Sequence, residues 1–230
     1  MGQSRSSQVL NVLFVGGAIL IAVYSWAIYG LLTEWLIPLG SAVHPDMQQA
    51  FNKEKAAIYI HAMASATALA IGPFQVIPSW RHKHMLGHRR AGRVYFVCCF
   101  AGSISGMTLS LSAQGGMVGK VGFFSLGVVW LLSNLVGFVA IVFPKIRTIW
   151  LHEAAMQVSC ALTYSAVSLR IMLPVAVLNT EHFQPLYGAI AWLCWTVNLV
   201  ILGIIWLCQK EGSKTTEPAA AEQLPAKDVM

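Results

Sequence analysis

The sequence has few charged residues, which occupy only 10% of its 230 positions. A soluble domain carries about 25%, so this chain has too few charges to coat a surface that faces water. Hydrophobic residues make up 57% of the sequence. The composition therefore predicts an integral, multi-pass membrane protein whose main partner is the lipid bilayer.

Motifs that would indicate a familiar chemistry are also missing. The sequence contains no evident repeat, no Gly-rich phosphate loop, no HExxH and no G-x-S-x-G. The adjacent Cys98 and Cys99 match neither a zinc spacing nor a CxxC pair. The net charge of +6 comes from short cationic clusters between apolar runs, without an aromatic-basic module. We therefore expect lipid headgroups, and no nucleic acid, as the partners of these cations.

Six apolar segments are long enough to cross a hydrocarbon core of about 30 Å, which takes roughly 20 helical residues. They cover residues 10–32, 56–78, 94–113, 121–143, 152–177 and 186–208. The sequence thus predicts an all-α bundle of six transmembrane helices over residues 10–208, after a short N-terminal segment, 1–9. Residues 209–230 are predicted to be a disordered tail, because they are rich in Ala, Pro, Glu and Lys.

Lysine and arginine are unevenly distributed between alternate loops. If the N-terminus is cytoplasmic, eleven of the fifteen lie in cytoplasmic segments and Arg170 lies within the membrane. The outer loops then hold only Lys53, Lys55 and Lys120. The positive-inside rule therefore places both termini in the cytoplasm.

Polar side chains form a stripe along two of the predicted helices. Counted at about 100° per residue, five positions of the 56–78 helix lie within about 40° of one line: His61, Ser65, Gly72, Gln75 and Ser79. Five positions of the 152–177 helix do the same: His152, Met156, Ser159, Thr163 and Arg170. Lipid cannot hydrate such faces, so we expect both stripes to point into the bundle and to line a shared site. Hydrogen bonds between helices are the simpler explanation for the Ser and Thr members.

Arg170 is the cation predicted to lie inside the membrane, and an arginine is always charged. No Asp or Glu lies within the apolar part of another helix. Its counter-charge is then a carboxylate from an outer loop (Asp46, Glu54 or Glu181) or an anionic group on a ligand. The alternative is that the side chain reaches to the outer headgroups. The topology places His61 at a similar depth, either as a satisfied core histidine or as a ligand or proton carrier.

His88 and His152 lie at the predicted cytoplasmic ends of two different helices. Two histidines at one depth are what bis-axial ligation of haem b in a helical bundle requires. The nearby Arg89, Arg93 and Arg147 would meet the haem propionates. The alternatives are a loop hydrogen bond for His152 and a headgroup contact for His88.

Three motifs follow one another in the chain: GPFQ (72–75), HRRAGRVY (88–95) and IWLHEAAM…SLR (149–170). With His61 ahead of them, they resemble the ordered signature of a family of uncharacterised predicted membrane proteins known from bacteria and fungi. The resemblance covers approximately residues 55–175. It implies a multi-pass membrane protein, brings no established reaction, and points to seven residues: His61, Gln75, His88, Arg89, Arg93, His152 and Arg170.

The sequence leaves several functions open, and whether the chain is an enzyme is uncertain. We favour a haem-binding or quinone-linked redox protein, in which His88 and His152 are the haem ligands. The remaining residues of the site would bind a lipophilic small molecule: His61, Gln75, Arg89, Arg93 and Arg170. One alternative is a non-redox membrane enzyme of the cyclase or isomerase type, for which Glu153 is a candidate acid. Another is a small-solute or proton-coupled carrier that uses His61 and Arg170.

Overall fold

A computed structural model describes residues 5–31, 53–143 and 148–221. Over these residues the chain forms α-helices, one π-helix and one 3-10 helix, and no strand. Six helical spans are long and apolar enough to cross a membrane: Val9–Gly30, Lys55–Val76, Met85–Ser110, Gly116–Val142, Ile149–Leu178 and Thr180–Glu211. The predicted all-α class with six transmembrane helices is confirmed.

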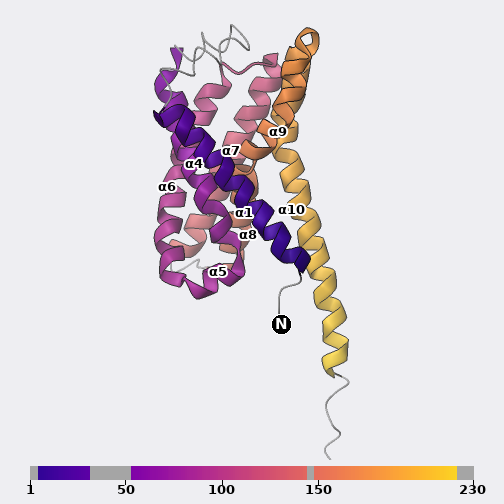
Figure 1. Ribbon diagram of the computed structural model, residues 1–230. Helices are drawn as coiled ribbons and strands as arrows, with labels where there is room; N and C mark the ends of the chain where they lie inside the picture. Colours follow the sequence, from indigo (N-terminus) through magenta and orange to yellow (C-terminus); the bar gives the residue numbers. More distant parts are fainter. Residues whose placement is uncertain (1–4, 32–52, 144–147, 222–230) are drawn as a thin grey trace, which may run out of the picture.

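The helices follow one another as an up-and-down bundle with one short helix at its end (Figure 1). Their bounds are α1 Arg5–Trp26, η1 Ala27–Leu31, α4 Lys55–Val76, α5 Pro78–Lys83, α6 Met85–Ser110, α7 Gly116–Val142, α8 Ile149–Thr163, α9 Ser165–Leu178, η3 Thr180–His182 and α10 Phe183–Ala221. The start of α1 and the end of α10 lie at the same end of the bundle as α5. We call this the α5 end and the opposite one the Lys55 end. The cytoplasmic location of the α5 end stays a prediction.

The third span differs most from its predicted bounds, because α6 begins at Met85 rather than at residue 94. The HRRAGRVY motif therefore lies on the helix and not in a loop. Arginine is a good helix former, and its long side chain can carry the charge to the membrane surface while the backbone continues as helix. As a result, successive side chains of this motif point in different directions around α6, with the spacing of an α-helix.

The fifth span is interrupted at Tyr164, where α8 ends and α9 begins. The Tyr164 ring stacks on Phe14 of α1, with ring centroids 4.6 Å apart, and its hydroxyl donates a hydrogen bond to the Phe14 carbonyl oxygen. The predicted span over residues 152–177 nevertheless falls within a single apolar span, Ile149–Leu178. Tyr164 keeps helical dihedral angles, φ −69° and ψ −10°, and its amide donates to the Cys160 carbonyl oxygen, 3.0 Å away.

The last span also extends further than predicted, because α10 continues through residues 209–221. The helix continues past residue 208 because the next three residues, Gln209, Lys210 and Glu211, are good helix formers and none of them is a glycine or a proline. The disorder predicted for residues 209–230 thus does not apply to the part that the structure describes as helix. Residues 222–230 lie outside the described residues.

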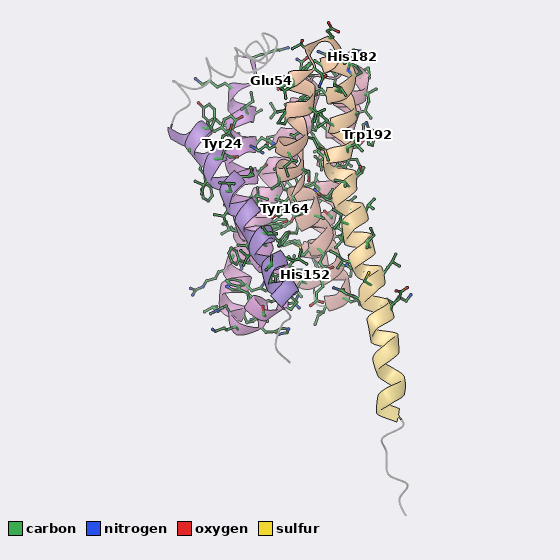
Figure 2. All side chains as sticks on the ribbon, turned by 45° about the vertical axis from the view of Figure 1, so that its right-hand side comes forward. Tyr24, Glu54, His152, Tyr164, His182 and Trp192 are labelled. Atoms are coloured by element: carbon green, nitrogen blue, oxygen red, sulfur yellow. The ribbon has the colours of Figure 1, made fainter. Side chains whose placement is uncertain are left out.

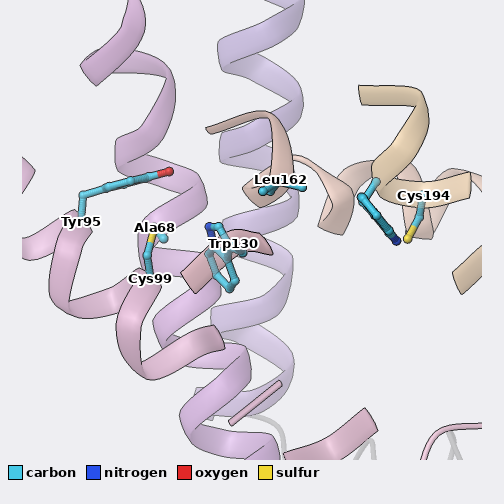
Figure 3. Close-up of a cluster of buried hydrophobic side chains, with 7 residues drawn as sticks. Ala68, Tyr95, Cys99, Trp130, Leu162 and Cys194 are labelled. Carbon is cyan, nitrogen blue, oxygen red and sulfur yellow. The ribbon is translucent and has the colours of Figure 1, made fainter. Parts of the chain in front are cut away.

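The core lies between α4, α6, α7, α8 and α10 and is centred on two aromatic side chains, Tyr95 and Trp130 (Figure 3). Glycines allow this packing. A Cβ built at Gly102 would lie 2.9 Å from Ser65 Oγ and 3.0 Å from the Trp130 ring. A Cβ built at Gly106 would lie 3.0 Å from the His61 ring. The spaces beside these glycines are therefore filled by side chains of the neighbouring helices, as is typical of small residues at helix contacts in membranes.

Replacing Gly102 by alanine should destabilise the bundle, because the methyl group would collide with Ser65 and Trp130. We expect a loss of about 1–3 kcal/mol in the free energy of unfolding, measured by thermal unfolding in detergent. Gly203→Ala is the matched control, since a Cβ at Gly203 meets nothing within 4 Å. Equal stability of the two variants would contradict the close packing of α4 against α6.

Candidate functional site

In the middle of the bundle, the hydroxyl group of Tyr95 links α6 to α8. This oxygen lies 3.1 Å from Ser159 Oγ and 3.0 Å from Thr163 Oγ1, both on α8. The Thr163 hydroxyl donates its own proton to the Ser159 carbonyl oxygen, so its oxygen accepts from Tyr95. Tyr95 is 1% exposed and reaches from α6 into the core (Figure 3). Two members of the α8 stripe therefore point inward, toward α6.

The stripe on α4 also faces α6 rather than α8 for most of its length. His61 Nδ1 lies 2.8 Å from the Gly102 carbonyl oxygen, and Gln75 Oε1 lies 3.3 Å from a Cβ built at Gly92. Gly72 is where the two stripes come together, because a Cβ there would lie 3.3 Å from both Cys160 Sγ and the Tyr95 ring. The two stripes thus share Tyr95 as a neighbour. They do not face each other along their whole length.

His152 and His61 have the same hydrogen-bond arrangement. His152 Nδ1 lies 2.7 Å from the carbonyl oxygen of Gly137 on α7, as His61 Nδ1 does from that of Gly102 on α6. A carbonyl oxygen only accepts, so Nδ1 carries the proton in both rings. In the neutral imidazole, Nε2 then keeps its lone pair. A backbone acceptor on Nδ1 is the usual support of a histidine that binds a metal through Nε2.

A cluster of ionisable side chains gathers at the α5 end around His152, which Figure 2 shows at the end of the bundle opposite to Glu54 and His182. His88 on α6 lies close enough to His152, Arg81 and Arg89 to interact electrostatically. Arg81 on α5 forms an ion pair with Glu153 on α8, with 2.9 Å between Nη1 and Oε1. His88 and His152 are thus within electrostatic range of each other, and the ion pair links α5 to α8 at the same end of the bundle.

Six buried side-chain atoms lack a hydrogen-bond partner among the described residues: Ser65 Oγ, Gln75 Nε2, His88 Nδ1, Trp130 Nε1, Asn134 Oδ1 and Trp195 Nε1. Gln75 is 6% exposed and Asn134 is fully buried; Asn134 uses its amide nitrogen to donate to the Phe96 carbonyl oxygen, 3.1 Å away. An unsatisfied buried polar group costs roughly 1–3 kcal/mol. Toward the α5 end, Gln75 and His88 are therefore two side chains with a hydrogen-bonding atom left for water or a ligand.

Arg170 makes its hydrogen bonds away from the other predicted site residues. Its guanidinium donates to the Ala166 carbonyl oxygen and to Ser25 Oγ, both at 2.9 Å, so these bonds lie on the α1 side of α9. The guanidinium is nevertheless near enough to His61 to interact with it electrostatically. The expectation of one site shared by His61 and Arg170 therefore stays a prediction.

The outer carboxylates proposed as its counter-charge lie elsewhere or outside the described residues. Glu54 accepts a hydrogen bond from the Ser112 hydroxyl, and Glu181 is exposed on η3. Asp46 is not among the described residues. The structure therefore gives Arg170 no carboxylate partner in the part of the chain that it describes.

The remaining predicted site residues lie on the outside of the cluster. Arg89 and Arg93 are both exposed on α6, and only Arg89 is near His88. Arg147, expected beside them, lies outside the described residues. Sequence reasoning missed Asn134, although a lone amide in the most apolar stretch of the chain is a signal for a buried polar role. It also missed the Arg81–Glu153 ion pair, which needs the position of α5.

The fold defines the class of protein, an integral multi-pass membrane protein. More particularly, the chain belongs to the family described as predicted membrane protein (DUF2306), whose model matches residues 58–206, more than half of the chain. The matched residues run from α4 into α10 and contain every residue of the α5-end cluster. No curated protein and no solved structure matches the chain.

The hydroxyl of Tyr95 should stabilise the contact between α6 and α8. Tyr95→Phe keeps the ring and removes only the hydroxyl group with its two buried hydrogen bonds. We expect a loss of roughly 1–3 kcal/mol in the free energy of unfolding. A cycle with Ser159→Ala, followed by thermal unfolding, should give a coupling energy of at least about 0.5 kcal/mol. Strictly additive effects would show that the two hydroxyls do not interact.

Proposed function

We propose that the α5 end of the bundle binds a haem-type cofactor between α6 and α8, and that the protein takes part in electron transfer at the membrane. His88 and His152 are the proposed ligands. The observation that carries the proposal is the pairing of a supported imidazole, His152 with Nδ1 bonded to Gly137, with a second imidazole close to it on another helix.

The set of donors favours haem over a metal ion bound by the protein alone. In the described residues, no group of three or more His, Cys, Asp or Glu side chains comes together. Zinc sites need three or four protein ligands, whereas a porphyrin brings its own nitrogen donors and leaves the axial positions to two side chains. Two histidines from different helices are therefore a sufficient set for haem.

On its inner side, the region proposed for the cofactor ends at the contact between Tyr95 and Ser159. Tyr95 follows His88 by seven residues, and Ser159 follows His152 by seven. At about 1.5 Å per residue, the Tyr95–Ser159 contact lies about 10 Å further into the bundle than the histidines. Gly92, between His88 and Tyr95, adds no side chain to this space. We infer that the cofactor occupies the region between the ion pair of Arg81 and the Tyr95 hydroxyl.

The residues around the histidines would hold and orient the bound group. The unpaired Nε2 of Gln75 is a donor for a polar edge of the cofactor. The guanidinium groups of Arg81 and Arg89 lie near His88 and suit anionic carboxylates such as propionates. Bound haem would supply a one-electron redox centre, and the location in the bilayer makes a lipophilic carrier such as a quinone the natural partner class.

The alternative functions gain less from the structure. Glu153, the acid considered for a cyclase or isomerase, already forms the ion pair with Arg81. In a carrier, His61 and Arg170 would act together; the two interact electrostatically, but the hydrogen bond of His61 goes to α6 and that of Arg170 to α1.

Purified full-length protein, expressed with haem supplied, should show a Soret band that both His88→Ala and His152→Ala abolish. Each variant removes one axial ligand, and a bis-histidine site with one ligand holds its cofactor far less tightly. The measurement is the visible spectrum, normalised to protein concentration and accompanied by a thermal unfolding curve that shows each variant to be folded.

His182→Ala is the matched control, because His182 is exposed at the Lys55 end. It should keep the full spectrum. A wild-type protein without a Soret band under these conditions would sink the proposal, and so would a spectrum that survives both substitutions.

Gln75→Leu tests whether the Gln75 amide lacks a hydrogen-bond partner in the cofactor-free protein. In the cofactor-free protein the substitution removes an unsatisfied polar group at nearly constant volume, so we expect a gain of about 1 kcal/mol, or roughly 2–4 °C in Tm. In the loaded protein that gain should shrink, because the amide then has a partner. Gln157→Leu is the contrasting variant: Gln157 accepts a hydrogen bond from Trp206 Nε1, so its loss should lower Tm. A lower Tm for cofactor-free Gln75→Leu would contradict the analysis.

A further inference from the structure

Arg170 is a cation inside the span Ile149–Leu178 and has no carboxylate partner among the described residues. It lies eight residues before the end of α9, which is about 12 Å along the helix axis. Its side chain is half-buried.

The hydrogen bonds of Arg170 within the described residues go to the Ala166 carbonyl oxygen and to Ser25 Oγ, and its guanidinium carbon lies 5.7 Å from the centroid of the Tyr24 ring. His61 and Tyr29 are also near enough to interact with it electrostatically.

These contacts do not neutralise the charge. Ser25 donates its own proton to the Ile21 carbonyl oxygen, 2.8 Å away, so its oxygen is free to accept from Arg170. A carbonyl, a hydroxyl and an aromatic face are dipolar or quadrupolar partners, and each leaves the full positive charge in place. The guanidinium also has more N–H donors than these contacts use. A charge held within the hydrocarbon region without a counter-ion is costly, and such residues normally pair with an anion.

We propose that Arg170, with Ser25 and Tyr24, binds the net-anionic headgroup of a membrane lipid. The guanidinium is suited to this role because its planar set of donors matches the oxygen atoms of a phosphate group. The hydrogen bonds to Ser25 and Ala166 fix the position of the guanidinium and leave other N–H donors for a ligand.

The surroundings indicate that the ligand enters from the bilayer and not from water. Tyr24 is 52% exposed, and next to Arg170 the apolar side chains of Ile171 and Val175 are 72% and 54% exposed. In a membrane these surfaces contact acyl chains. A lipid placed there would pack its chains against α9 and α1 while its headgroup reaches the guanidinium.

The backbone of α1 is irregular at the same place. The π-helix η1 begins at Ala27, two residues after Ser25, and Tyr29 within it is near enough to interact electrostatically with Arg170. Single π-helical turns inside α-helices occur frequently at functional sites. This observation is independent of the charge of Arg170 and points to the same seam between α1 and α9.

The test uses the full-length protein in detergent, stripped of lipid and titrated with phosphatidylglycerol, phosphatidylcholine or inorganic phosphate. Native mass spectrometry counts the bound molecules on wild type, Arg170→Gln, Arg93→Gln and Gly203→Ala. We expect phosphatidylglycerol to bind wild type at least about tenfold more tightly than Arg170→Gln, since a hydrogen bond to a charged group contributes that much. Arg93→Gln removes an exposed cation at the other end and measures the non-specific contribution of a surface arginine, which should be smaller than the loss in Arg170→Gln; Gly203→Ala, which keeps every charge and adds a methyl group that meets nothing within 4 Å, should bind like wild type.

Arg170→Lys covers the case in which Arg170→Gln does not fold, because it keeps the charge and loses the planar set of donors. It should bind phosphatidylglycerol several-fold more weakly than wild type. Affinities for phosphatidylglycerol within twofold of wild type in the folded Arg170 variants would overturn the proposal. Equal binding of phosphatidylcholine would overturn the requirement for net negative charge. Binding of inorganic phosphate with the same dependence on Arg170 would overturn the assignment to a lipid.

Discussion

Hydrocarbon offers no hydrogen-bond partner, so each polar side chain within the spans has to find one on another helix or on its own backbone. This constraint determines which helices touch. His61 is bonded to the backbone of α6, Asn134 on α7 to that of α6, and His152 on α8 to that of α7. Tyr95 joins α6 to α8. The pairing is incomplete among the described residues, both toward the α5 end, on Gln75 and His88, and elsewhere in the bundle, as on Ser65 and Trp195.

The glycines are what allow the histidines to reach their partners. The acceptors of both imidazole protons are glycine carbonyl oxygens, on Gly102 and Gly137. A Cβ at Gly137 would lie 2.6 Å from Met156 Sδ, so a larger residue there would push α8, and His152 with it, away from α7. The glycine at each contact therefore allows the close packing and also supplies the carbonyl oxygen that fixes the proton on Nδ1 of the imidazole. The available lone pair on Nε2 of His152 is a consequence of how tightly α7 and α8 approach.

The fold could be predicted from the sequence, because apolar length alone identifies a membrane span and all six were found. The inward direction of Ser159 and Thr163 was also predictable, since a polar face cannot be left in lipid. The hydrogen bond of Arg170 to Ser25 on α1 was not, because it joins residues that lie 145 positions apart in the chain. Periodicity is a local signal and contains no information about such a distant contact. The Arg81–Glu153 ion pair was hidden for the same reason, as it depends on where α5 turns back.

The two proposed sites draw on different parts of the chain. His88, His152, Gln75 and the ion pair beside them all lie within residues 58–206, which the family model matches. The partners of Arg170 on α1, Ser25 and Tyr24, precede that range. A chain that began at α4 would keep every contact of the α5-end cluster, yet it would leave Arg170 with the carbonyl oxygen of Ala166 alone. Because an unpaired guanidinium in lipid is costly, α1 is best understood as the element that makes this charge tolerable and, by leaving donors unused, turns it into a place where an anion can bind.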